Sequence, residues 1–172
     1  MGIAPSLSVD VEVTLTADMF TQMRSTMTLQ RMFENARWLR NVTGATSEDY
    51  AADFPQLPLL TSRDVLRFAT QEGANDLKLG SKVGSLTPGK EADIIILDAQ
   101  AINVAPLNVV PGAVVSLMER SNVETVIIAG KVRKWQGKLV NVNLARLRNE
   151  LENSRDFLFS AAGIPQNLFR PN

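Results

Sequence analysis

The chain has 172 residues, and 45% of them are hydrophobic, which is enough to bury a core without disulfides or a structural metal. Its 18 Lys plus Arg balance 18 Asp plus Glu, so net charge gives no attraction toward nucleic acid or anionic lipid, and neither is expected as a partner. Cysteine and histidine are both absent, which excludes disulfides, thiolate zinc sites, a Ser-His-Asp triad and a histidine general base within this chain.

Two further features bear on location. The N-terminal stretch "MGIAPSLSVD" lacks a basic segment followed by an apolar one, so no secretory signal is expected. The most apolar region, residues 94–118, is interrupted by polar residues and two prolines, which argues against a membrane span. We therefore expect a cytoplasmic protein that does not bind membranes.

The first expected elements are a strand and a helix. Residues 7–15 alternate small or apolar with polar positions and are rich in β-branched side chains, which predicts a strand with Asp10 near its middle or its C-terminal end. From Thr16 to about Arg40 the pattern becomes helical, and Thr16 or Asp18 is suited to cap that helix.

This helix carries apolar residues on two faces. One stripe consists of Phe20, Met23 and Met27, and the other of Leu29, Met32 and Ala36. A helix of this kind is normally covered on two sides, so we expect neighbours on both. Residues 41–60 mix Gly, Pro, Ser and Asp without a period, which predicts a long loop that is functional or covers something.

A second helix is expected to begin at Thr61 or Ser62, with Asp64 favourably placed in its first turn, and to end near Gly80. Its predicted buried stripe is Val65, Leu66, Ala69, Gly73 and Leu77. Because glycine weakens a helix, we expect Gly73 to be present so that another backbone can approach closely.

The C-terminal half predicts strands followed by a helix. A turn at Pro88-Gly89 leads into the strand "IIIL". "ETVIIAG" and "VRKW" form a hairpin with its turn at "GK", and "QGKLV" supplies one more turn and strand. Asn143 then caps an amphipathic helix, which we expect to pack by one face. The predicted stripe, expected to be buried together, is Leu144, Leu147, Leu151 and Leu158.

Three stretches resemble the C-terminal part of the metal-dependent amidohydrolase superfamily, in its cytosine and guanine deaminase and triazine hydrolase branch. "SLSVDVEVTLTADMFTQMR" is similar to the family's eighth barrel strand and the following helix. "LTSRDVLRFATQEGANDLKLGSKVGSLTPGKEADIIILD" resembles the family's helix that runs into a "GSL.PGK.ADL.VLD" pattern, and this match is the most specific. "VETVIIAGKVRKWQGKLV" is similar to the family's closing hairpin.

The resemblance implies an α+β chain that is a fragment. Residues 1–85 would be the remnant of a TIM-like barrel, namely its last strand and following helices. Residues 86–142 would be strands of a partial β-sandwich, and residues 143–172 a C-terminal helix and tail. Barrel strands one to seven and the family's histidines would lie outside this chain.

The resemblance also implies a role for Asp10. At the C-terminal end of a barrel strand, a carboxylate faces the mouth where catalytic groups collect. In the intact parent enzyme Asp10 would bind zinc or iron and carry a proton from the attacking water to the leaving ammonia or amine. Zinc is usually bound by about four ligands, so no metal is expected in this chain alone. Asp10 in this chain would then be an ordinary solvated residue.

Other residues have simpler interpretations. Glu12 would share a side of the strand with Asp10, and a solvated or salt-bridged pair is favoured over acid-base work. Asp93 is expected to be structural, at a strand entrance. Trp135, beside Arg133 and Lys134, is expected to pack on the core with its hairpin face. The methionines at 19, 23, 27 and 32 are expected to fill an irregular interior.

Two functions follow. The favoured one is the C-terminal part of an amidohydrolase that deaminates or otherwise hydrolyses a C–N bond of a nitrogen heterocycle, inactive as the isolated chain. The alternative is a non-catalytic interaction or oligomerisation module derived from that fold. We expect a homo-oligomer whose interface uses residues 9–13 and the Phe20, Met23 and Met27 stripe, and the missing N-terminal part of the enzyme as another partner.

Overall fold

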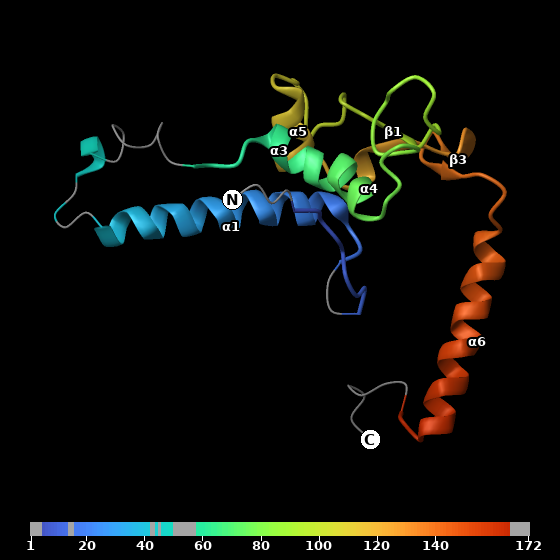
Figure 1. The fold of residues 1–172 in the computed structure, drawn as a ribbon. Coiled ribbons are helices and arrows are strands. Elements are labelled where there is room, and N and C mark those ends of the chain that lie inside the picture. The colour runs from blue at the N-terminus through green and yellow to red at the C-terminus, as the bar shows by residue number, and fades with distance from the viewer. Residues whose placement is uncertain (1–4, 14–15, 42–43, 45, 50–57, 166–172) are drawn as a thin grey trace. The chain divides into compact units, whose positions relative to one another are not determined.

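The computed structural model describes residues 5–13, 16–41, 44, 46–49 and 58–165 (Figure 1). The chain divides into two units, Met1–Lys138 and Leu139–Asn172. Helices are combined with a four-stranded antiparallel sheet, so the α+β class is confirmed. Within the described part of the chain, no helix is long and apolar enough to cross a membrane. The predicted domain boundaries at residues 85 and 142 stay predictions.

Helix α1 spans Met19–Asn41, close to the predicted range. Asp18 is its cap, since the carboxylate accepts hydrogen bonds from the Phe20 N–H at 3.1 Å and the Thr21 hydroxyl at 2.6 Å. Phe20 and Met23 are buried and Met27 packs against the core, so the first stripe is confirmed as a buried face. It packs inside the chain, and the expected contact with a second copy stays a prediction.

The second stripe of α1 is not covered by the described residues. Leu29 and Met32 are 48% and 50% exposed, and Phe33 and Leu39 on the same side are also exposed. The expected filling role of Met32 is therefore wrong, because this side of α1 has no apolar neighbour there.

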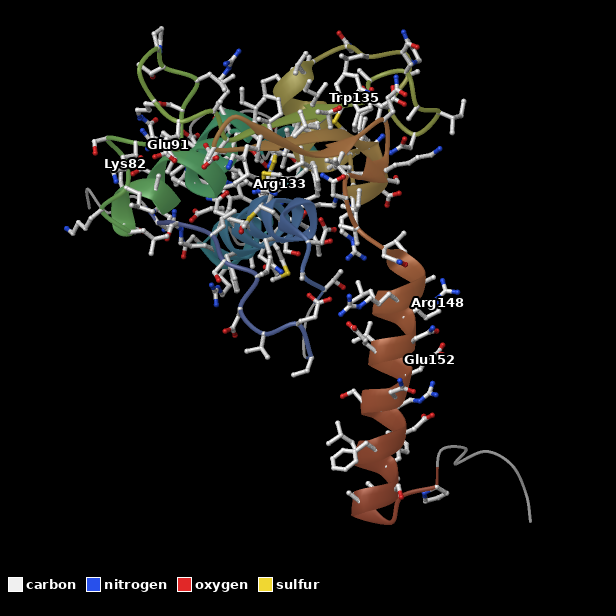
Figure 2. All side chains as sticks on the ribbon, turned by 90° about the vertical axis from the view of Figure 1, so that its right-hand side faces the viewer. Lys82, Glu91, Arg133, Trp135, Arg148 and Glu152 are labelled. Atoms are coloured by element: carbon white, nitrogen blue, oxygen red, sulfur yellow. The ribbon has the colours of Figure 1, made fainter. Side chains whose placement is uncertain are left out.

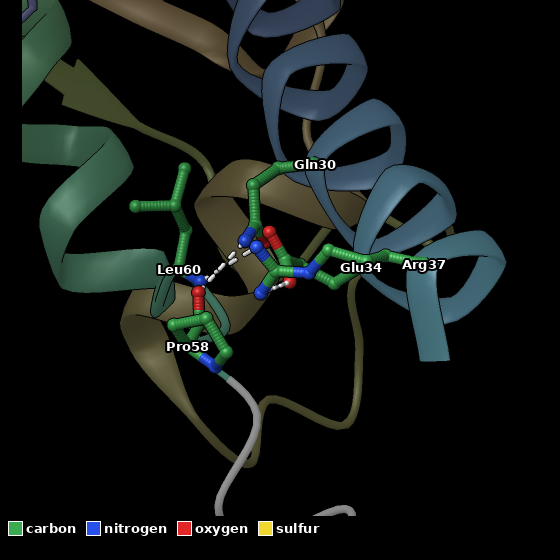
Figure 3. Close-up of polar contacts among 5 residues, drawn as sticks. All are labelled: Gln30, Glu34, Arg37, Pro58 and Leu60. Carbon is green, nitrogen blue, oxygen red and sulfur yellow. Dashed lines mark hydrogen bonds and ion pairs between the residues drawn. The ribbon is translucent and has the colours of Figure 1, made fainter. Parts of the chain in front are cut away.

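The chain before the next helix is fastened to α1 by one side chain. Gln30 donates from Nε2 to the Pro58 carbonyl at 2.8 Å and accepts from the Leu60 N–H at 3.1 Å (Figure 3). The ion pair of Glu34 and Arg37 lies one turn further along α1 (Figure 3). Most of the predicted loop at 41–60 lies outside the described residues.

Helix α3 spans Ser62–Arg67 and continues through a π-helical turn, η2 (Phe68–Glu72), into α4 (Gly73–Asp76). Thr61 is the cap, as predicted: its hydroxyl accepts from the Asp64 N–H at 3.2 Å, and the Asp64 carboxylate accepts from the Thr61 N–H at 2.9 Å. The Thr61 hydroxyl also donates to the Asp64 carboxylate at 2.6 Å. The two bonds that the carboxylate accepts lower the pKa of Asp64, the bond from the Thr61 hydroxyl most.

The buried face of this helical segment differs from the prediction. Val65 is buried, but so are Phe68 and Ala74, whereas Leu77 is 71% exposed. The π turn changes the register after Arg67, and α4 ends at Asp76, before Leu77 is reached. The predicted stripe assumed 3.6 residues per turn along the whole segment, and this assumption is wrong at the end of the segment.

The close backbone approach expected at Gly73 occurs at Gly84. A Cβ on Gly73 would meet only the Phe68 carbonyl oxygen, at 3.9 Å. Gly84 has φ +89, and a Cβ there would lie 2.6 Å from the Cβ of Ala74. The loop around Gly84, rather than the helix, thus carries the glycine that close packing requires.

The sheet has the order β1-β2-β3-β4, with β1 at Ile94–Leu97, β2 at Val123–Ile128, β3 at Lys131–Trp135 and β4 at Lys138–Leu139. The predicted hairpin is confirmed by the antiparallel register of β2 and β3. Ala129 and Gly130 form its two-residue turn with φ 48 and 74, as a right-twisted hairpin requires, and Gln136 and Gly137 repeat the pattern with φ 46 and 78.

The core of the first unit lies where α1, α3 and α5 (Val110–Ser116) meet. Helix α5 and the 3₁₀ turn η3 (Arg120–Asn122) were not predicted. The buried apolar cluster is Phe20, Met23, Val65, Val104, Ala113, Val115 and Met118. Asn122 is buried beside it, and its side chain exchanges hydrogen bonds with that of Asn103 at 2.9 and 3.1 Å.

The second unit contains α6 (Leu144–Ala162). Asn143 caps it as predicted, accepting from the Arg146 N–H at 2.9 Å, and Gly163 closes it with φ 65. No residue of α6 is buried, and its four stripe leucines are 45% to 63% exposed. The expectation that they are buried together is therefore wrong, because no described residue of the second unit covers that face.

Candidate functional site

Asp10 lies in an exposed segment that does not form the predicted strand. Residues 5–11 have no regular secondary structure, and residues 12–13 form a turn. Asp10 itself has φ 53, and its N–H donates to the Ser8 hydroxyl at 3.1 Å. A left-handed residue interrupts an extended run, and a lone strand without a neighbour gains no ladder bonds. The strand prediction is wrong for this chain.

The segment before Asp10 is nevertheless held in place. The Leu7 N–H donates to the Phe68 carbonyl at 3.3 Å, and the Leu7 side chain packs against the core. That carbonyl lies in η2, where the π turn alters the helical hydrogen-bond pattern. Asp10 and Glu12 are both exposed, and without a strand the expectation that they share one side does not hold.

The described residues do not hold a metal ion by themselves. Among them, no three His, Cys, Asp or Glu side chains lie close enough together to form a site. The whole sequence also lacks histidine and cysteine. Because Zn²⁺ takes about four ligands, a metal bound through Asp10 would need ligands from another polypeptide segment.

The "GSLTPGK" stretch has a structural explanation. Lys90 donates from Nζ to the Gly80 carbonyl at 2.5 Å and to the Val83 carbonyl at 3.2 Å. The Glu91 N–H donates to the Lys82 carbonyl at 2.8 Å, and Figure 2 labels these two residues. Together with Gly84, these bonds position the loop between α4 and β1, so the stretch serves packing.

Asp93 also serves the fold, as predicted. Its carboxylate accepts a hydrogen bond from the Ala129 N–H at 2.8 Å, in the turn between β2 and β3. The neighbouring Gly130 N–H donates to the Ala92 carbonyl at 3.0 Å. The entrance to β1 is therefore tied to the hairpin turn.

Trp135 does not pack on the core. It is 53% exposed, and Arg133 on the same strand is also exposed (Figure 2). The prediction of a core-facing hairpin side is wrong at this residue, because the far side of β3 has no covering layer in the described part of the chain.

Two hollows in the described part of the first unit differ in polarity, and a further one of about 530 Å³ lies along α1. The larger, about 600 Å³, lies between the helical segment α3–α4 and strand β1, and most of its lining is apolar, including Ala69, Leu77, Leu86 and Ile95. The smaller, about 330 Å³, is polar and is lined by Asp18, Glu119, Arg120 and Ser121. Asp18 and Glu119 there are engaged in capping bonds, so the smaller hollow contains no uncommitted acid-base pair.

Sequence reasoning missed the large hollow, since its lining comes from a helix, a loop and a strand that are brought together only by the fold. The exposure of Leu77 and Leu86, 71% and 80%, is the feature that marks it. Apolar surface of this extent is typical of a face that another segment covers.

Known proteins that match this chain are several times longer than the part that it matches. A deaminase of 5-methylthioadenosine and S-adenosylhomocysteine from Caldanaerobacter subterraneus is 30% identical over 121 residues, covering 70% of this chain and 26% of the relative. The corresponding enzyme of Desulfitobacterium hafniense is 30% identical over 151 residues, covering 88% of this chain and 28% of the relative. The chain thus spans about a quarter of the length of these relatives.

Solved structures give the same result. An adenosine deaminase from Xanthomonas campestris, with bound zinc, matches with a TM-score of 0.64 and 26% identity over 83% of this chain and 28% of its own. An atrazine chlorohydrolase from Arthrobacter aurescens, complexed with zinc, shares the fold with a TM-score of 0.52 at 19% identity, over 60% of this chain and 22% of its own. The model of the amidohydrolase family matches residues 6–133, and the chain therefore belongs to the amidohydrolase family.

Proposed function

We infer that the chain is the C-terminal part of a metal-dependent amidohydrolase that hydrolyses a C–N bond of an amino-substituted nitrogen heterocycle. The observation that carries this is the family match over residues 6–133 together with relatives named as deaminases of adenosine-type compounds. A purine nucleoside of the adenosine type is the first substrate class to test.

Asp10 is the residue that this chain contributes to the chemistry. It is an exposed carboxylate within the matched range, and no described side chain forms a hydrogen bond or ion pair with it. In the assembled enzyme its carboxylate would be one ligand of zinc or iron. It would also accept the proton of the attacking water and return it to the departing amine.

The remaining ligands must come from another segment, because this chain has no histidine. The exposed apolar surfaces support this partner: the 600 Å³ hollow, the outer face of α1, and Ile95 and Ile96 of β1, which are 53% and 45% exposed. As the end strand of the sheet, β1 offers an unpaired edge to an incoming strand. The isolated chain would be catalytically inactive.

The test uses this chain joined to the coding sequence that flanks it in its genome. We expect that sequence to encode the histidines of the barrel, and the joined protein to retain zinc or iron and to release ammonia from an adenine nucleoside. Asp10→Asn should abolish ammonia release and weaken metal retention, while Glu12→Gln, a matched acid two residues away, should leave both in place.

Equal activity of the Asp10→Asn and Glu12→Gln proteins would show that Asp10 is not part of the site. A flanking sequence that encodes no histidine-bearing barrel would favour the second candidate, a non-catalytic interaction module. The stripe of α6, which is exposed within the second unit, is the observation that supports such a module.

A further inference from the structure

Helix α6 has an apolar stripe without a cover. Its 19 residues run from Leu144 to Ala162, with a cap at each end and no buried residue. Leu151 is 63% exposed and Leu158 60%, so the stripe is as open at its middle as at its end. A stably capped helix with a continuous exposed apolar stripe is suited to pairing with another helix.

The spacing of the stripe is that of a coiled coil. Leu144, Leu151 and Leu158 recur every seven residues, and Leu147, Ser154 and Ala161 recur every seven residues between them. These are the alternating three- and four-residue steps of the a and d positions, with leucine at every a position and at the first d position. The small Ser154 and Ala161 leave room for close approach at the C-terminal half.

The charges beside the stripe select the partner. In this register Glu150 occupies a g position, and Arg148 and Arg155 occupy e positions. In a parallel pair, the g residue of one helix faces the e residue of the next heptad in the other, so Glu150 faces Arg155 of the second copy, twice by symmetry. An antiparallel pair would place e positions opposite each other and oppose arginines.

Contacts within α6 do not prevent this pairing. Glu150 forms an ion pair with Arg146 at 2.7 Å, and Arg155 with Asp156 at 2.7 Å. All four side chains are about half exposed or more, so these ion pairs contribute little and can be shared. The outer face of α1 lacks such complementarity, since α1 has four arginines and one glutamate.

We propose that α6 joins two copies of this chain as a parallel, two-stranded coiled coil, with Glu150 of each copy facing Arg155 of the other. Asp10 is not a residue of this surface, and the proposal does not depend on the proposed enzymatic function. It replaces the expected interface at residues 9–13 and α1.

Charge reversal in the full chain tests the partner and the register. By sedimentation equilibrium, Glu150→Arg and Arg155→Glu should each weaken the dimer on the order of tenfold, because both symmetric pairs become repulsive. The double variant should restore the dimer, and an equimolar mixture of the two single variants should form a heterodimer. Glu152→Arg, at a b position outside the seam, and Arg146→Ala, which removes only the intrahelical pair, should leave the dimer unchanged.

Cysteine cross-linking tests the orientation, and the chain has no cysteine of its own to interfere. Oxidation of the Ala161→Cys chain should link two copies rapidly, since equivalent d positions face each other in a parallel pair, whereas Asn149→Cys, on the outer side, should not. A monomeric wild-type chain, failure of the double reversal to restore the dimer, or equal cross-linking at both positions would each overturn the proposal. Circular dichroism verifies that each variant keeps its helix.

Discussion

Gly84 lies in close contact with helix α4 of the first unit. Its φ of +89 disfavours any side chain, and an added Cβ would lie 2.6 Å from the Cβ of Ala74. We expect Gly84→Ala to lower the free energy of unfolding by about 2 to 4 kcal/mol, combining backbone strain with overpacking. Gly89 is the matched control, with φ +92 and nothing near its Cβ position, so Gly89→Ala should cost only about 1 to 2 kcal/mol. Chemical denaturation measures both, and equal losses would contradict the packing contact.

The cap at Thr61 predicts an acid dependence of stability. Hydrogen bonds from Thr61 lower the pKa of Asp64, so the folded state favours the ionised carboxylate. That stabilisation is present above the unfolded pKa, near 4, and is lost as pH falls through the lower folded value. Thr61→Ala should cost about 1 kcal/mol at neutral pH and make unfolding less sensitive to acid. Urea unfolding at pH 7 and at pH 3 measures this. If the free energy of unfolding falls by the same amount between the two pH values with and without Thr61→Ala, the cap is not formed.

At the scale of elements, the two faces of α1 should differ sharply. Met23 is 4% exposed and Met32 is 50% exposed on the same helix, so one substitution at two sites isolates burial from helix propensity. Met23→Ala should destabilise by about 2 to 4 kcal/mol, as buried Met→Ala changes do, while Met32→Ala should stay within about 0.5 kcal/mol. Thermal unfolding of both variants decides this; a comparable loss at Met32 would mean that the outer face is covered after all.

Local chemistry predicted the ends and turns of the elements well. Asp18, Thr61 and Asn143 cap helices as expected, because each cap depends on a side chain and the first turn beside it. The hairpin was predictable for the same reason, although its turn lies at Ala129-Gly130, one residue before the predicted Gly130-Lys131. The π turn at Phe68–Glu72 has no comparable local signal, so the burial of Phe68 and the exposure of Leu77 could not be predicted.

At the scale of the whole molecule, an apolar pattern predicts which face of an element is buried, but it does not predict which other segment covers that face. The stripes at Leu29 and Leu151 were predicted correctly as apolar faces, but their burial was not, because the described chain supplies no partner for them. The strand expected around Asp10 fails for the same reason, since a barrel strand is stabilised by neighbours. Asp10 as a candidate came from the family resemblance, and its role stays a prediction.

The metal content of the isolated chain provides a whole-molecule prediction. Because no histidine is present and the described residues contain no group of three ligands, the purified chain should retain no stoichiometric zinc after dialysis. Atomic absorption measures this directly. Retained zinc that is lost in Asp10→Ala, but not in Glu12→Ala, would show that the chain builds a site alone and would contradict the need for another segment.

The order of the sheet has a consequence for how the chain folds. Strands β2, β3 and β4 follow one another in both sequence and space, so their contacts close over two-residue turns and should form within microseconds. Strand β1 should pair with β2 later, because residues 98–122, which include α5, separate the two strands in the sequence. Loop closure makes such distant contacts the slow ones. We therefore expect the hairpin to acquire hydrogen-exchange protection first, during a refolding pulse, and the β1–β2 ladder only as the α1, α3 and α5 core closes.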